Sequence, residues 1–215
     1  MSASFVTLKL ATTLDGRIAT ASGESRWITG PEARQAVHRL RAEHNAVLVG
    51  VETALADDPE LTVRLDGYDG AQPARVVLDS HQRLPVTAKL ARTAGDIATY
   101  VVCGSPPRAD LLDLGVRVLQ AADQGRPSPR AALEALAGVG LNRVFIEGGG
   151  QVAASFLQAG LVDAVEWFRA SMVIGAEGRP GIGDLALSAL SDAPRLKRVD
   201  VREVGSDLWE RYERI

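Results

Sequence analysis

The chain has 215 residues, and its 24 lysines and arginines stand against 27 aspartates and glutamates, which gives a formal net charge of −3. This balance disfavours bulk binding to nucleic acid or to an anionic membrane, so any anion must be bound by a local basic cluster. Hydrophobic residues make up 46% and charged residues 24% of the chain, a globular composition that argues against intrinsic disorder.

No run of about 18 apolar residues occurs, and the N-terminus lacks the basic and apolar segments of a signal peptide. The one cysteine, Cys103, excludes an intramolecular disulfide and a multi-cysteine zinc site, and the three histidines show no metal-binding spacing. We therefore expect a cytoplasmic protein without a metal or a membrane partner. Loop-like stretches at 67–73 and 124–129 lie inside the strand–helix alternation, so we expect one domain over residues 1–215.

The first half of the chain alternates apolar strands with helical segments. Residues 5–11 predict an opening strand, and the polar, glycine-rich residues 15–30 predict a functional loop. A capping-box pair and the i, i+3, i+4, i+7 apolar pattern predict a helix over 31–43. The continuous apolar run at 46–50 predicts a strand buried on both faces, and a loop or short helix follows over 51–64.

The second half continues this alternation and then changes. Further strands are expected at 75–79, 97–103, 116–119 and 143–147, and helices at 107–114, 129–137 and 151–160. The tail predicts one long strand over 163–173 and a hairpin of 195–204 with 207–215, turning near Gly205. The order predicts an α/β fold with a mostly parallel sheet that ends in antiparallel strands.

Three glycines, Gly148, Gly149 and Gly150, join an apolar strand to a helix. Glycines at such a junction let backbone N–H groups approach a phosphate closely, so a pyrophosphate site is one interpretation. A tight turn with close packing is the other. Gly148, Gly150 and Ala153 fit the G-x-G-x-x-A pattern, but its late place in the chain and the lack of an acid ending the next strand disfavour a Rossmann domain.

Basic residues suggest a second anion site. Arg34, His38 and Arg41 share one helical face, which is usually a solvated face. Because guanidinium groups match phosphate geometry, Arg41 and Arg64 together with Ser25 form a candidate phosphate clamp. The spacing alone does not show that these three residues converge.

Two acids and one tryptophan are further candidates. Asp57 and Glu147 each lie beside an apolar run and are candidates for proton transfer, although each also fits a cap or an ion-pair partner. Trp27 fits either stacking on a flat ring or anchoring its loop to the core. Neither a G-x-S-x-G elbow nor a P-loop motif occurs, which disfavours those hydrolases and NTPases. Cys103 fits a small core residue.

Four segments resemble the reductase domain of the bacterial riboflavin-biosynthesis deaminase/reductase family. They are KLATTLDGR at 9–17, SGESRWIT at 22–29, VGVETALADDP at 49–59 and IEGGG at 146–150. The resemblance runs from about residue 6 to 175 and more weakly to the end. It implies a dihydrofolate-reductase-like three-layer sandwich and NADPH-dependent reduction of 5-amino-6-(5-phosphoribosylamino)uracil to its ribitylamino product, with a homodimer and no metal.

The resemblance also implies roles for individual residues. The substrate contacts fall on Ser25, Arg41, Leu61, Arg64 and Glu147. The cofactor contacts fall on Ala11, Trp27, Thr53, Asp57, Ser80, Gly149, Gly150, Gln151, Val152, Ala153, Ala154 and Ser155. Asp57 and Glu147 would handle protons, with Lys9 as an electrostatic helper. Ser80 and Arg83 follow a strand and are expected to receive the 2′-phosphate of NADPH, so Arg83→Ala should weaken NADPH binding far more than NADH binding.

The chain departs from this family in two ways. The H-x-E and P-C-x-x-C signatures of the zinc deaminase are absent, so we expect either a stand-alone reductase or a separated domain, which cannot perform the deamination itself. A separate deaminase protein is a candidate partner. Ser171 stands where the family commonly has proline. Two other functions stay open: a reductase of the same fold acting on another heterocycle such as a pterin, and a non-catalytic nucleotide-binding module.

Overall fold

The computed structural model describes residues 4–122 and 125–215, which fall into two compact units. The first unit holds residues 4–5 and 38–146, and the second holds residues 6–37 and 147–215. Three elements run across this division in the chain. They are strand β1 (Phe5–Thr12), helix α1 (Pro31–Ala42) and strand β7 (Arg143–Gly148).

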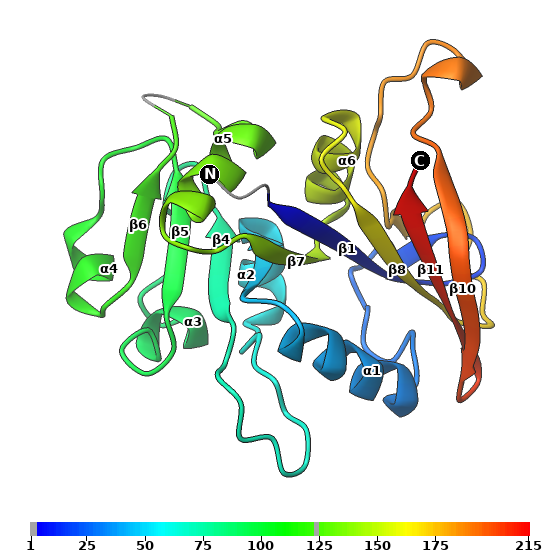
Figure 1. Ribbon diagram of the computed structural model, residues 1–215, viewed down its shortest axis with the longest axis horizontal. Helices are drawn as coiled ribbons and strands as arrows, with labels where there is room; N and C mark the ends of the chain where they lie inside the picture. Colours follow the sequence, from blue (N-terminus) through cyan, green and yellow to red (C-terminus); the bar gives the residue numbers. More distant parts are fainter. Residues whose placement is uncertain (1–3, 123–124) are drawn as a thin grey trace. The chain divides into compact units, whose positions relative to one another are not determined.

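The first unit is built on four parallel strands. They lie side by side in the order β3 (Ala46–Gly50), β4 (Ala74–Leu78), β5 (Thr99–Cys103) and β6 (Arg117–Gln120). The last three of them are labelled in Figure 1. Every residue of β3 and β5 is buried, as expected for continuous apolar runs in a parallel sheet. Four helices connect or follow these strands: α2 (Val51–Asp57), α3 (Lys89–Arg92), α4 (Ala109–Asp113) and α5 (Pro129–Gly138).

A buried arginine supports the segment that links β4 to β5. Arg75 is 1% exposed, and burial lowers the pKa of its guanidinium. The guanidinium donates hydrogen bonds to the carbonyls of Leu90, Thr93 and Ile97 and to the hydroxyls of Thr93 and Thr99, over 2.6–3.4 Å. The three carbonyls belong to α3 and to the turn after it. One side chain therefore satisfies carbonyl oxygens for which the short helix provides no N–H donor.

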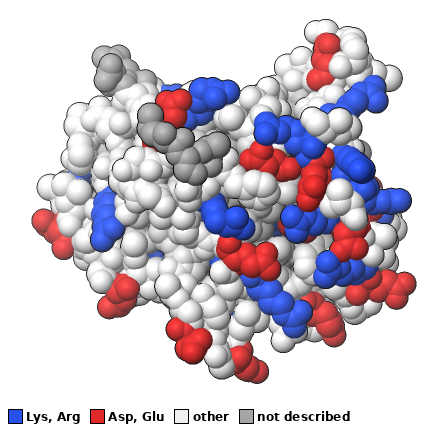
Figure 2. All heavy atoms as spheres, viewed as in Figure 1, with Lys and Arg blue, Asp and Glu red and all other residues white. Residues whose placement is uncertain are grey.

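The second unit combines a parallel strand pair with a hairpin. Strand β1 (Phe5–Thr12) pairs in parallel with β8 (Ala164–Arg169), and β8 pairs antiparallel with β11 (Asp207–Arg214). Strand β10 (Leu196–Val204) completes the hairpin through the turn at Gly205, whose φ is +65°. Lysines, arginines, aspartates and glutamates are interspersed over this hairpin (Figure 2).

Three smaller elements complete the second unit. Helix α6 (Gly150–Gln158) precedes β8 in the chain, and a 3-10 turn (Leu190–Asp192) precedes β10. A separate two-stranded ladder joins β2 (Arg17–Ala19) to β9 (Arg179–Pro180). None of the helices in the described ranges is long and apolar enough to cross a bilayer.

The predicted α/β class, with mostly parallel strands and an antiparallel C-terminal hairpin, is confirmed. The single long strand over 163–173 is wrong, because β8 ends at Arg169. Its two neighbours end at the same level, since Thr12 and Leu208 are both in register with Arg169. Ser171 then leaves the sheet and donates a hydrogen bond to the carbonyl of Ser206 (2.8 Å), a bond that proline could not donate.

Candidate active site

The expected substrate residues of the first unit gather around the backbone of Thr62. Arg41 is 9% exposed, and its Nη1 donates to Thr62 O over 2.6 Å. His38 Nδ1 lies 3.1 Å from both Thr62 O and the Arg64 backbone nitrogen. Leu61, between Glu60 and Thr62, is buried although its φ is +56°, a conformation that a branched side chain rarely adopts. The structure thus brings Arg41, Leu61 and Arg64 to one short loop.

The two arginines of this loop differ in environment. Arg41 is buried, so the interpretation of its helical face as purely solvated is wrong at this position. Arg64 is exposed, and its Nη1 lies 2.9 Å from Glu60 Oε2 and 3.3 Å from Thr62 Oγ1. An exposed ion pair of this kind contributes only about 0–1 kcal/mol, so a phosphate can compete with Glu60 for Arg64.

The expected cofactor residues of the first unit lie at the ends of β3 and β4. Thr53 and Asp57 are on α2, which begins directly after β3, and Ser80 and Arg83 follow β4. The Asp57 side chain is exposed and has no hydrogen bond or ion pair within the described residues, so the ion-pair interpretation of this acid is not supported. Arg83 Nη2 forms an ion pair with Glu52 Oε1 at 2.7 Å.

In the second unit, Lys9 and Ala11 point to one face of β1. They are two residues apart and are in register with Glu166 and Phe168 of β8, which therefore share that face. Glu166 is 1% exposed, accepts a hydrogen bond from Trp209 Nε1 (2.6 Å) and lies 3.4 Å from Arg211 Nη1. Lys9 is half-buried, as is Glu147 near the end of β7.

The loop with Ser25 and Trp27 holds its tryptophan in an exposed position. The Trp27 side chain is 69% exposed and its φ is +73°, so the alternative of anchoring in the core is excluded. The Arg34 guanidinium lies over the indole at 4.1 Å, within the range of a cation–π contact. The ring is therefore available to a flat ligand while its backbone is held in an unusual conformation.

The glycine turn before α6 has features that bear on both interpretations made for it. Gly149 has φ +90°, and Ala153 is the first residue of α6 whose N–H is bonded back to it (3.0 Å). The three preceding N–H groups have no acceptor inside the helix, which is the geometry that a pyrophosphate needs. A Cβ on Gly150 would lie 2.7 Å from the carbonyl oxygen of Pro180, so close packing also requires this glycine.

A segment that the sequence analysis did not single out packs against these loops. Gly181 N donates to Gly16 O (2.9 Å) and Gly183 N to Gly150 O (2.8 Å). A Cβ on Gly181 would lie 2.9 Å from Thr12 Cγ2, and one on Gly178 would lie 2.9 Å from Arg17 Cγ. We call residues 178–183 the glycine strap. The close spacing of its glycines is the sequence signal that would have identified it.

Asp15 ties the start of the functional loop to the residues before the glycine strap. Its carboxylate accepts hydrogen bonds from Thr13 Oγ1 (2.5 Å), Gly175 N (2.6 Å) and Ile174 N (3.3 Å). The Thr13 hydroxyl, followed by the two amides, lowers the pKa of this carboxyl to about 2.

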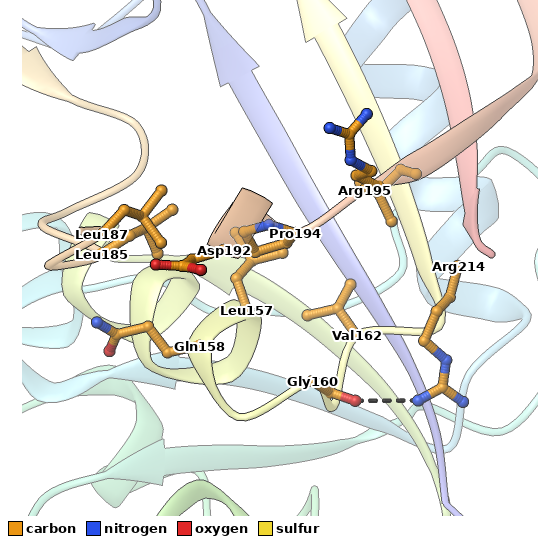
Figure 3. A pocket seen from close by; sticks show the side chains of 11 residues that line it. Leu157, Gln158, Gly160, Val162, Leu185, Leu187, Asp192, Pro194, Arg195 and Arg214 are labelled. Atoms are coloured by element: carbon orange, nitrogen blue, oxygen red, sulfur yellow. Dashed lines mark hydrogen bonds between the residues drawn. The ribbon is translucent and has the colours of Figure 1, made fainter. Parts of the chain in front are cut away.

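A pocket of about 390 Å³ in the second unit lies away from the expected contacts (Figure 3). Leu157, Val162, Leu185 and Leu187 give it an apolar wall, and Arg214 at its rim donates to Gly160 O over 2.9 Å. None of the residues expected to bind substrate or cofactor lines it.

Comparison with known proteins decides the family. The family described as "RibD C-terminal domain" matches residues 4–209, nearly the whole chain. The chain belongs to this family. Riboflavin biosynthesis protein RibD of Aquifex aeolicus is 36% identical over 97% of the chain, which covers 58% of that relative. In structure, the chain resembles form 2 of Acinetobacter baumannii RibD with a TM-score of 0.87 and 36% identity, over 98% of the chain and 58% of that protein.

A relative from Methanothermobacter thermautotrophicus is similar in length to this chain. The 2,5-diamino-6-ribosylamino-4(3H)-pyrimidinone 5′-phosphate reductase of Methanothermobacter thermautotrophicus is 37% identical, with 97% of both chains covered. The chain spans little more than half the length of the bacterial RibD relatives. The resemblance stated from the sequence and the fold class that it implied are both confirmed.

Proposed function

We propose that the chain reduces the ribosyl group of 5-amino-6-(5-phosphoribosylamino)uracil to the ribityl group, with NADPH as the hydride donor. The observation that carries this proposal is the Methanothermobacter relative, which is named as a reductase of a phosphorylated ribosylaminopyrimidine and matches along both chains. The buried Arg41 and the adjacent Arg64 supply the charge that a substrate phosphate requires.

Some of the site residues are assigned to substrate binding and others to proton transfer. Arg41 and Arg64 bind the substrate phosphate and hold the sugar in a fixed orientation. Ser25 is assigned to the substrate as a hydroxyl donor. Once the ribosylamine has opened to an imine, the reaction needs a hydride at C1′ and a proton at the nitrogen. Asp57 and Glu147 are the acids that supply or relay this proton, and the ammonium of Lys9 favours negative charge nearby.

The second unit fits a dinucleotide cofactor at the glycine turn. The N–H groups in the first turn of α6, which have no acceptor inside the helix, suit a pyrophosphate, and Gly149 and Gly150 add no side chain that would block it. When bound, the nicotinamide supplies the hydride. Trp27 offers an exposed aromatic face, and Ala11 offers a small surface against which a ring can lie.

The test follows NADPH absorbance with purified protein and four compounds in parallel. They are the phosphorylated uracil substrate, its 2,5-diaminopyrimidinone counterpart, the unphosphorylated uracil analogue and dihydrofolate. We expect oxidation with the phosphorylated uracil, a loss of about 100-fold or more in kcat/KM for Arg64→Ala and no loss for the exposed control Arg130→Ala.

Each other outcome points to a different function. Preference for the diaminopyrimidinone would show that this chain acts on the substrate for which the Methanothermobacter relative is named. Oxidation with dihydrofolate alone would assign a reductase of another heterocycle, and NADPH binding without any oxidation would assign a nucleotide-binding module.

We further propose that the protein is a cytoplasmic homodimer whose reaction follows a deamination carried out by another domain or protein. The longer RibD relatives are named for riboflavin biosynthesis, and one related structure is titled as both a deaminase and a reductase. Sedimentation should give twice the 22.8 kDa mass of the chain. A monomer at micromolar concentration would contradict the dimer but not the reaction.

A further inference from the structure

The Arg83 guanidinium lies between two carboxylates. Its Nη2 is 2.7 Å from Glu52 Oε1, and its Nε is 3.8 Å from Asp79 Oδ1. Glu52 is in the first turn of α2, directly after β3, and Asp79 directly follows β4. Because β3 and β4 are parallel neighbours, the two acids reach Arg83 from adjacent strand ends.

Asp79 is completely buried, yet only one of its oxygens is satisfied. Oδ2 accepts the Leu84 N–H over 2.8 Å, whereas Oδ1 has no hydrogen-bond donor within the described residues. A buried acceptor without a donor is costly, so Asp79 attracts the Arg83 guanidinium, whose Nε is 3.8 Å from Oδ1. A phosphate that binds Arg83 is repelled by this negative charge, whereas a neutral hydroxyl is not.

The other charged residues around Arg83 do not make this place positive. Arg108 interacts electrostatically with Asp79, but its Nη2 also binds Asp110 Oδ2 at 2.5 Å. Arg83 and Arg108 are thus outnumbered by Glu52, Asp79 and Asp110, and this cluster carries one net negative charge. The 2′-phosphate of NADPH is mostly dianionic at neutral pH, whereas NADH has a neutral 2′-hydroxyl at that position.

We propose that Glu52 and Asp79 set the cofactor preference of this chain by competing with the 2′-phosphate of NADPH for Arg83, so that NADH is accepted alongside NADPH. The inference rests on the proposed function, because it needs a dinucleotide at Ser80 and Arg83. It changes what Arg83 does: the guanidinium is shared with two acids and so gives only a moderate preference for the phosphorylated cofactor.

The test measures the dissociation constants of NADPH and NADH by fluorescence titration. For the unmodified chain we expect the two constants to differ by less than about tenfold. Glu52→Gln should raise the preference for NADPH about two- to fivefold, as expected for loss of one exposed ion pair. Asp79→Asn should raise the preference for NADPH further, because it removes the buried carboxylate charge. Its amide oxygen still accepts the hydrogen bond from Leu84 N–H, so the fold is kept. The control is Glu134→Gln, an exposed glutamate on α5, which should leave the ratio unchanged.

A double variant separates competition from a general charge effect. In the Arg83→Ala background, Glu52→Gln should no longer change the ratio, because the guanidinium for which it competes is gone. An unchanged ratio in both Glu52→Gln and Asp79→Asn, or an equal change in the Arg83→Ala background, overturns the inference alone. Failure of both dinucleotides to bind overturns the proposed function as well.

Discussion

At the scale of single residues, Arg75 shows how much one buried side chain can organise. Its guanidinium satisfies three carbonyls and two hydroxyls between Leu90 and Thr99. Arg75→Met keeps the apolar stem but leaves these acceptors without a donor, so we expect the free energy of unfolding to fall by about 2–4 kcal/mol. Urea denaturation measures this. The exposed control Arg130→Met should change it by less than about 0.5 kcal/mol, and an equally small effect at Arg75 would contradict the role.

Asp15 gives a prediction about pH. Hydrogen bonds lower the pKa of its carboxyl from 3.8 to about 2, so the charged form is favoured in the folded state. The stabilisation is therefore complete above about pH 4 and is lost as the pH falls toward 2. Asp15→Asn should be less stable than the unmodified chain at pH 5, and the difference should shrink through this window. Asp113→Asn, at an exposed position on α4, is the control, and a difference independent of pH would contradict the assignment.

The sequence predicted the identity of candidate residues better than their surroundings. Arg41 and Arg64 were paired because guanidinium groups suit phosphate, and both do reach the same loop. The burial of Arg41 depends on how residues 60–64 fold over α1, which no helical periodicity encodes. The ion pair of Arg83 with Glu52 was equally invisible, since it joins the ends of two strands that only the sheet makes neighbours.

At the scale of elements, the glycine turn before α6 offers a test of close packing. A methyl group on Gly150 would lie 2.7 Å from the Pro180 carbonyl oxygen, and backbone must move to admit it. Gly150→Ala should lower the free energy of unfolding by about 1–3 kcal/mol and weaken NADPH binding. Gly138→Ala meets nothing within 4 Å and should raise stability by about 0.4–1 kcal/mol. If Gly150→Ala and Gly138→Ala changed the Tm equally in thermal unfolding, the packing argument would be ruled out.

Elements with a strong local signal were predicted within one or two residues. The buried run of β3 and the hairpin around Gly205 are examples, since each has continuous burial or turn chemistry of its own. The end of β8 was missed because residues 170–174 stay largely apolar while their ladder partners end at Thr12 and Leu208. Strands of two or three residues, such as β2 and β9, are too short to show an alternation of apolar and polar residues in the sequence.

At the scale of the whole molecule, cofactor binding should be visible as stability. A ligand that binds only the folded chain at 100 times its dissociation constant adds about 2.7 kcal/mol, which raises the Tm of a chain of this length by about 5–10 °C. We expect NADPH to produce such a shift in Arg64→Ala as well, since that arginine is assigned to the substrate. A thermal scan with ATP as the control ligand should show a smaller rise in Tm than NADPH gives. If NADPH raised the Tm of Arg64→Ala less than that of the unmodified chain, the assignment of Arg64 to the substrate alone would be contradicted.

The glycine strap has a kinetic consequence for ligand binding. It is hydrogen-bonded to Gly16 on one side and to Gly150 on the other, and its own glycines leave no room for a methyl group. The loop that carries Trp27 and the turn that starts α6 therefore share one tightly fitted neighbour, so a displacement of either is transmitted to the other. We expect a ligand that orders one of them to change how fast a ligand binds at the other, and stopped-flow binding rates measured with and without the first ligand would test this.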